Sequence, residues 1–222
     1  MTAWPGERYR EGEHVTEEYV EVRDEPRHRH RFENEYVRVY DVLIPPADTT
    51  LYHRHVEDTF YVAVNEATVR DQTWGHDDRR SGTAAAGTVM CRPHRSRPLI
   101  HQVHNAGSSE MRLIGAEIKT SPLLTSPAAL DAPGHTLTLE RDRLRVYELS
   151  LAPGESTGTV DYRFSSLTVF LTIATVLTRS LSGGEHIGVH APGDVIWMPG
   201  PVSFSLINLG EEPYRAAVGE WR

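Results

Sequence analysis

The sequence predicts an all-β protein made of two copies of one sandwich or barrel. Short runs of β-branched and aromatic residues are separated by Gly, Pro, Asn and Asp, and no segment shows a convincing helical period. The second half repeats the first, since RVYDVLIPPADTT at 38–50 matches RVYELSLAPGEST at 145–157, an offset of 107 residues. Two further blocks keep the same order: 87–93 matches 193–199, and 105–117 matches 208–220. Three ordered matches indicate a duplicated β unit.

The first copy divides into short expected strands and two expected loops. The segment YVRVYDVLI ends at Pro45-Pro46, because proline cannot donate to a sheet ladder. Pro26–Arg31, which includes His28 and His30, lies among arginines with no apolar run after it, and we expect a solvated loop. Gln72–Ala86 is polar and rich in Gly and Ala, which favours a flexible loop. The expected strands are Glu17–Arg23 at an edge, Tyr36–Ile44, Leu51–Val64, Thr68–Asp71, Gly87–Pro93, His101–Asn105 and Met111–Ile118.

These signals divide the chain into two domains and a connection. We expect an N-terminal domain over residues 1–120, in which 1–15 form a loose charged arm, and a C-terminal domain over residues 136–222. The segment between them, 121–135, is rich in proline, so it is expected to be a linker with at most one short helical turn.

The composition favours a soluble cytoplasmic protein with a small-molecule partner, and it allows a homodimer. The 222 residues carry 23 basic and 31 acidic side chains, a formal net charge of −8, which argues against nucleic acid as a partner. The longest apolar run, Leu167–Leu177, is shorter than the roughly 20 residues of a membrane span. The N-terminal segment lacks the apolar core of a signal peptide. Cys91 is the only cysteine, so no internal disulfide can form and a reducing compartment fits.

Histidines supply the candidate site. His53 and His55 stand at the head of the apolar run, and residues i and i+2 of a strand face the same side. His101, in HQVHN, provides a third imidazole from elsewhere in the chain. Three imidazoles facing one interior are a plausible set of ligands for a divalent metal ion. We favour this interpretation over three hydrogen-bonded core histidines.

At these residues the sequence resembles the cupin superfamily. The first cupin motif contains HxH followed by a glutamate, and the second runs G-x5-P-x-G-x2-H-x3-N. Here His53-Arg54-His55 matches HxH, Gly87 and Pro93 match G-x5-P, and His101 with Asn105 matches H-x3-N. The resemblance covers both halves and implies a bicupin, that is, two jelly-roll barrels, with a metal held by the two motifs. In that setting Asn105 would orient an imidazole from outside the ligand shell.

Two departures from the cupin pattern concern the ligands. Thr59 stands where the family has its glutamate, so the favoured site has three histidines, as in the cupin branch of thiol dioxygenases. Glu57 is an alternative fourth ligand if a bulge turns its carboxylate inward. The segment before His101 is longer than in the family pattern by three residues, so His94 or His104 could take its place.

The second copy has lost the ligand positions. The repeat aligns the three histidines with Val160, Tyr162 and Phe204, none of which is an ordinary metal ligand. We therefore expect one divalent metal per chain, bound in the N-terminal barrel, and a C-terminal barrel filled with side chains or holding an apolar ligand.

The resemblance and the ligand set suggest a metal-dependent enzyme. With no anionic ligand the metal keeps its full charge, which suits an anionic substrate; iron is favoured, and nickel, copper, manganese and zinc are alternatives. The favoured activity is a three-histidine iron dioxygenase that acts on a small organic acid, thiol or phenol. A metal-dependent isomerase or lyase would need a general base, for which Tyr61, His104 and Glu117 are candidates. The third hypothesis is a non-catalytic barrel that binds a small molecule.

Overall fold

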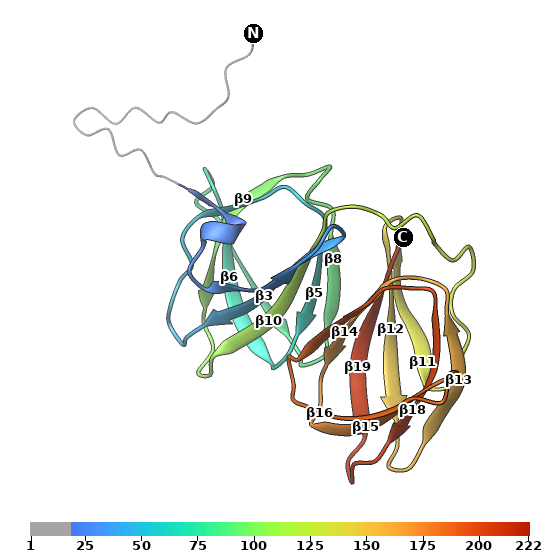
Figure 1. Cartoon of the computed structure of the whole chain (residues 1–222). Helices are drawn as coiled ribbons and strands as arrows, with labels where there is room; N and C mark the ends of the chain where they lie inside the picture. Colours follow the sequence, from blue (N-terminus) through green and yellow to red (C-terminus); the bar gives the residue numbers. More distant parts are fainter. Residues whose placement is uncertain (1–18) are drawn as a thin grey trace, which may run out of the picture.

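The computed structural model describes residues 19–222, and the arm predicted at 1–15 lies outside the described residues. Within these described residues, nineteen strands and one short 3-10 turn form two barrels that lie side by side (Figure 1). The all-β class and the duplicated architecture are thereby confirmed. Within the described part of the chain, no helix is long and apolar enough to cross a bilayer.

The first barrel consists of two five-stranded sheets. One sheet has the order β1-β4-β9-β6-β7 and the other the order β2-β3-β10-β5-β8. The 3-10 turn, Val22–Asp24, follows β1. The strands are β1 Val20–Glu21, β2 His28–Glu33, β3 Val37–Ile44, β4 His53–His55, β5 Thr59–Ala63, β6 Ala67–Thr73, β7 Arg79–Ala84, β8 Val89–Arg92, β9 Leu99–Asn105 and β10 Met111–Ile118.

The second barrel repeats this arrangement without a counterpart of β1. Its sheets have the orders β11-β12-β19-β14-β17 and β13-β18-β15-β16. The pairing of β2 with β3 places His28 opposite Val42, and the pairing of β11 with β12 places His135 opposite Leu149, both 107 residues later. The strands are β11 His135–Arg141, β12 Leu144–Leu151, β13 Ser156–Tyr162, β14 Ser166–Phe170, β15 Ala174–Ser180, β16 Glu185–His190, β17 Val195–Met198, β18 Val202–Asn208 and β19 Tyr214–Trp221.

The two barrels share one hydrophobic core. Alternation along β5 turns Phe60 and Val62 out of the first barrel, while Thr59 and Tyr61 turn into it. Phe60 meets the indole of Trp221 from β19 edge-on, with ring centroids 6.3 Å apart. The outer faces of the β2-β3-β10-β5-β8 and β11-β12-β19-β14-β17 sheets therefore pack together. The buried residues of this shared core are Val37, Val39, Phe60, Val62, Val64, Ile114, Ala116, Ile118, Leu144, Val146, Leu167, Val169, Ala217 and Trp221.

Three segments differ from the sequence-based expectation. The polar segment Gln72–Ala86 contains the end of β6 and all of β7, which pair as a hairpin. The expected loop Pro26–Arg31 contains the start of β2. The expected single strand Leu51–Val64 is two strands, because the chain leaves β4 at His55 and crosses to the opposite sheet before β5 begins.

Candidate metal centre

Three histidines predicted from the motifs meet inside the first barrel. His53 and His55 flank Arg54 on β4, and both are buried, whereas Arg54 turns outward to pair with Glu21 at 2.5 Å. The register of β4 and β9 places His101 directly opposite His53. The His53 and His101 ring centroids lie 4.7 Å apart, and Nε2 of His101 lies 3.2 Å from Nε2 of His55.

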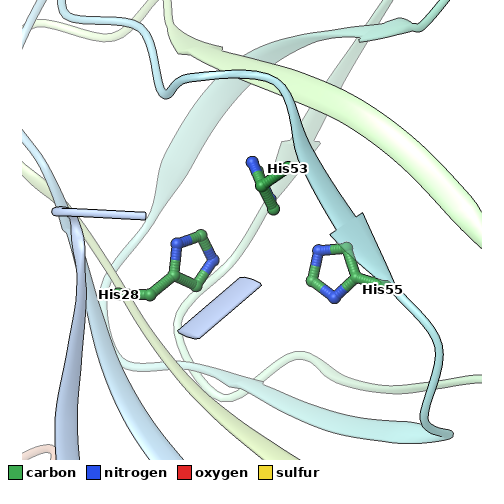
Figure 2. A group of neighbouring side chains, drawn as sticks. All are labelled: His28, His53 and His55. Atoms are coloured by element: carbon green, nitrogen blue, oxygen red, sulfur yellow. The ribbon is translucent and has the colours of Figure 1, made fainter. Parts of the chain in front are cut away.

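A fourth histidine, His28, completes the cluster and corrects the expectation that it lies in a solvated loop. It is buried at the start of β2, and its ring centroid lies 4.7 Å from that of His53. Ligand atoms of His28, His53 and His55 lie within 4.8 Å of one another (Figure 2). Figure 2 shows His28 facing the two β4 imidazoles from the other side of the barrel interior. His30, two residues further along, is exposed as expected.

The signal for His28 was present in the repeat. His135 lies 107 residues after it and starts the equivalent strand of the second barrel. A histidine retained at one position in both copies marks an interior position, whereas a loop histidine would not be expected to keep its place.

Each imidazole has its Nδ1 atom engaged outside the cluster. Nδ1 of His28 contacts the Glu25 carboxylate at 3.0 Å, Nδ1 of His53 contacts the Leu51 carbonyl at 2.8 Å, and Nδ1 of His101 contacts the Asp71 carboxylate. Carboxylates and carbonyls only accept hydrogen bonds, so these Nδ1 atoms must donate. In a neutral imidazole Nε2 then carries the lone pair, which is the arrangement that metal-binding histidines usually have.

The cluster therefore fits a divalent metal ion. The fourth imidazole, His55, has Nδ1 at 3.3 Å from the Tyr61 hydroxyl, and its Nε2 faces Nε2 of His101. The Tyr61 hydroxyl can donate to Nδ1 of His55, so Nε2–H of His55 can donate to Nε2 of His101 at 3.2 Å when no ion is bound. In the other tautomer of His55, both Nε2 lone pairs face the same point, as they do when both atoms bind one ion. Nitrogens bound to one ion at about 2.1 Å each lie roughly 3.0–3.4 Å apart, which agrees with this distance.

Burial keeps the imidazoles of His53 and His55 in the uncharged state that a metal requires. It lowers the pKa of His53 to about 2, and the neighbouring rings of His101 and His28 act in the same direction. Burial likewise holds the pKa of His55 well below its ordinary value. For Glu25, burial alone would raise the pKa, but the hydrogen bonds from His28 and from backbone N–H groups outweigh it. Glu25 thus remains an ionised partner for His28.

The carboxylate proposed as an alternative ligand lies elsewhere. Glu57 pairs with Arg95 at 3.0 Å and is not part of the histidine cluster. Thr59 is buried on the inner face of β5, where its hydroxyl donates to the Glu57 carbonyl at 2.9 Å. Tyr61 lies on the same face and contacts His55.

The two alternatives to His101 have different positions. His94 is buried, and its ring stacks on His55 with centroids 4.8 Å apart. Burial lowers the pKa of His94 to about 4. His104 lies on the outer face of β9, where Nδ1 contacts the Thr49 hydroxyl at 2.9 Å, because the neighbouring Val103 packs inside the barrel.

Asn105 and Glu117, two other residues named from the sequence, have counterparts in the second barrel that make the same contacts. Because the second barrel lacks the histidine cluster, these contacts do not depend on a metal. The Asn105 amide donates to the Ile44 and Ser109 carbonyls, and Asn208 makes the equivalent bonds to Leu151 and Glu212. No imidazole is among these partners. Asn105 therefore holds a turn, in the copy with the histidines as in the copy without them.

Glu117 is also part of a duplicated arrangement. Inside the first barrel it accepts hydrogen bonds from Tyr40 at 2.7 Å and Arg38 at 2.9 Å. In the second barrel the same bonds link Glu220 to Tyr147 at 2.6 Å and Arg145 at 3.1 Å. A buried charge needs such partners, and its recurrence in both copies indicates a structural role.

The second barrel replaces the cluster with packed aromatic side chains. Tyr162 stacks on Phe204 with centroids 4.6 Å apart, and both belong with Val160 to the core of this barrel. The retained His135 contacts the Tyr162 hydroxyl through Nε2 at 2.8 Å. Among the described residues, the three potential metal ligands that converge are His28, His53 and His55, and all of them lie in the first barrel.

Comparison with known proteins identifies the fold. No protein-family model matches the sequence, and no curated protein does. AerE from Microcystis aeruginosa aligns with 89% of this chain and 98% of its own, with a TM-score of 0.55 and 12% identity. A cupin 2 conserved barrel domain protein from Leptotrichia buccalis aligns over 87% of each chain, with a TM-score of 0.53 and 10% identity.

A third structure is a named enzyme. Salicylate 1,2-dioxygenase from Pseudoaminobacter salicylatoxidans, crystallised as adducts with gentisate, aligns with 84% of this chain and 68% of its own. The TM-score is 0.59 and the identity 15%. Likeness at these identities shows the fold: the chain has the bicupin fold, with a cupin-type barrel in each half.

The outer hydrogen bond of His101 provides a test of this geometry. Asp71→Asn removes the charge opposite Nδ1 and offers an amide that can donate instead of accept, which favours the wrong tautomer. We expect divalent-metal affinity to fall ~10–100-fold, measured by competition with a chromophoric chelator. Asp77→Asn, an exposed substitution in the turn after β6, is the control and should leave the affinity unchanged.

Proposed function

We propose that this bicupin is a metal-dependent enzyme whose N-terminal barrel binds one divalent ion through His28, His53, His55 and His101. The observation that carries the proposal is the common orientation of these imidazoles. Three of them have Nδ1 held by an acceptor, so that Nε2 faces the barrel interior. None of the cluster residues is a carboxylate.

The favoured activity is oxygenation of a small organic molecule. A redox-active ion such as iron supplies the activation of O2 that a dioxygenase needs. Imidazole ligands contribute no negative charge, so they favour an anionic substrate beside the ion. The likeness of fold to salicylate 1,2-dioxygenase supports this choice among cupin activities.

The chain's own residues shape the space next to the cluster. Tyr61 sets the orientation of His55 through its hydroxyl, and His94 covers one face of the same ring. Thr59 leaves room on the inner face of β5 where a glutamate would fill it. The burial of these side chains limits the access of water to the cluster.

An isomerase or lyase is less well supported. Such a reaction needs a side chain that is free to move a proton. Glu117 is held by Tyr40 and Arg38, and His104 lies on the outer face of β9. Tyr61 is the one remaining candidate of the three named from the sequence, and burial raises its pKa.

Metal analysis followed by oxygen uptake tests the proposal. We expect the purified chain to bind one divalent ion, and the Fe(II)-loaded protein to consume O2 with a small organic acid, thiol or phenol. His53→Ala should abolish both. Conversion of a substrate without O2 uptake would point to the isomerase or lyase alternative, and binding without conversion to a storage barrel. A wild-type protein that binds no divalent ion would refute the metal site itself.

A further inference from the structure

An exposed arginine ends a strand of the first barrel at a position that alternation assigns to the inner face. Arg92 ends β8, and the register of β8 with β5 places it directly opposite the buried Thr59. The preceding residue, Cys91, packs against the core between the barrels, so alternation turns Arg92 and Met90 to the inner face. Met90 pairs with Tyr61, the residue that contacts His55.

The guanidinium of Arg92 has no ionic partner among residues 19–222. Its side chain contacts the Met90 sulfur through Nη2 at 3.8 Å. The chain has 31 acidic and 23 basic side chains, so carboxylates are plentiful. Two less exposed arginines on inner faces of the barrels use them: Arg38 pairs with Glu117, and Arg145 with Glu220.

The second barrel shows what this position holds where the histidines are absent. The repeat aligns Arg92 with Met198, and the strand registers agree, since Met198 lies opposite Ser166 as Arg92 lies opposite Thr59. Met198 packs against the core of its barrel. The buried arginine–glutamate–tyrosine arrangement is kept in both copies, whereas the arginine at this position occurs only in the copy with the cluster.

We propose that Arg92 binds the carboxylate of the substrate, so that the substrate class is small organic molecules with a carboxylate beside the reacting group. This inference rests on the proposed function, because it places the substrate next to the metal. Guanidinium binds carboxylate through two parallel hydrogen bonds, which fixes orientation as well as charge. The Met90 contact is weak and is easily exchanged for such a pair.

The electrostatics agree with this placement. Burial raises the pKa of Tyr61, and the positive charge of Arg92 opposes that rise. Burial lowers the pKa of His94, and Arg92 adds to that effect. The charge of Arg92 therefore acts on Tyr61 and His94, the two side chains that flank His55.

Matched acids and amides test the proposal. The Zn-loaded protein is titrated calorimetrically with benzoate and benzamide, salicylate and salicylamide, and pyruvate and pyruvamide. We expect wild type to bind at least one acid ~10-fold or more tightly than its amide, and Arg92→Met to lose that preference. Arg92→Lys should recover only part of it. Metal content should be unchanged in both variants.

Arg29→Met is the charge-matched control. Arg29 is exposed and adjacent to His28 on β2, so it faces away from the cluster. Equal losses in Arg29→Met and Arg92→Met would indicate a general electrostatic effect and overturn the proposal. So would a wild type that prefers no acid over its amide. If wild type binds no metal, the proposed function fails, and the same titrations of metal-free protein still decide whether Arg92 binds carboxylates.

Discussion

Replacement of His28 by alanine should weaken divalent-metal binding at least ~100-fold. The substitution removes an imidazole whose ligand atom lies within 4.8 Å of those of His53 and His55. Loss of a ligand should cost at least as much as loss of an outer hydrogen-bond partner, for which 10–100-fold is typical. Affinity is measured by chelator competition, and circular dichroism checks that the strands remain.

His30→Ala is the matched control for this experiment. His30 lies on the same strand two residues away and is exposed, so its removal should leave metal affinity within about twofold of wild type. If His28→Ala binds metal as tightly as His30→Ala, the site consists of His53, His55 and His101 alone, and His28 is a core residue held by Glu25.

The second large effect concerns stability. Trp221→Ala should lower the free energy of unfolding by ~3–5 kcal/mol, because a fully buried indole is lost from the core between the barrels. The indole also donates to the Tyr36 carbonyl at 3.3 Å. Since residues of both barrels form this core, we expect wild type and variant to unfold in one transition that includes both barrels.

Urea unfolding followed by circular dichroism and by metal release measures this effect. Ile173→Ala is the control, since that side chain is 72% exposed and should change stability by less than about 0.5 kcal/mol. Two separate transitions, with metal release in only one of them, would show that the barrels are stabilised independently.

Much of the fold follows from local patterns in the sequence. Alternation and turn residues predict β3 and β10 almost to the residue, and the ordered repeat predicts the second barrel. The sequence pattern does not predict the hairpin of β6 and β7, because β7 is polar and mostly exposed and pairs only with β6. The sequence pattern also does not predict that the strand ends after His55. His55 and Thr59 on either side of the break both face inward, so the alternation of inward and outward residues continues although the chain changes sheet.

The candidate site is predictable only where a motif marks it. HxH and H-x3-N indicate His53, His55 and His101, and the structure brings these three together. His28 belongs to neither motif, and the sequence marks it only through the repeat, in which His135 is its counterpart. Arg92 has no such mark, because its position depends on the pairing of β8 with β5, a contact between strands that are distant in the chain.

The core between the barrels covers one sheet face of each copy. Each copy alone would expose an apolar sheet face, so a single unit is expected to self-associate through it. A covalent connection between two such units keeps them permanently at high effective concentration. The interior of the C-terminal copy holds Tyr162 and Phe204 at the positions of the histidines, and both belong to the core of that barrel. The C-terminal barrel thus covers the apolar sheet face that the N-terminal barrel would otherwise expose to water.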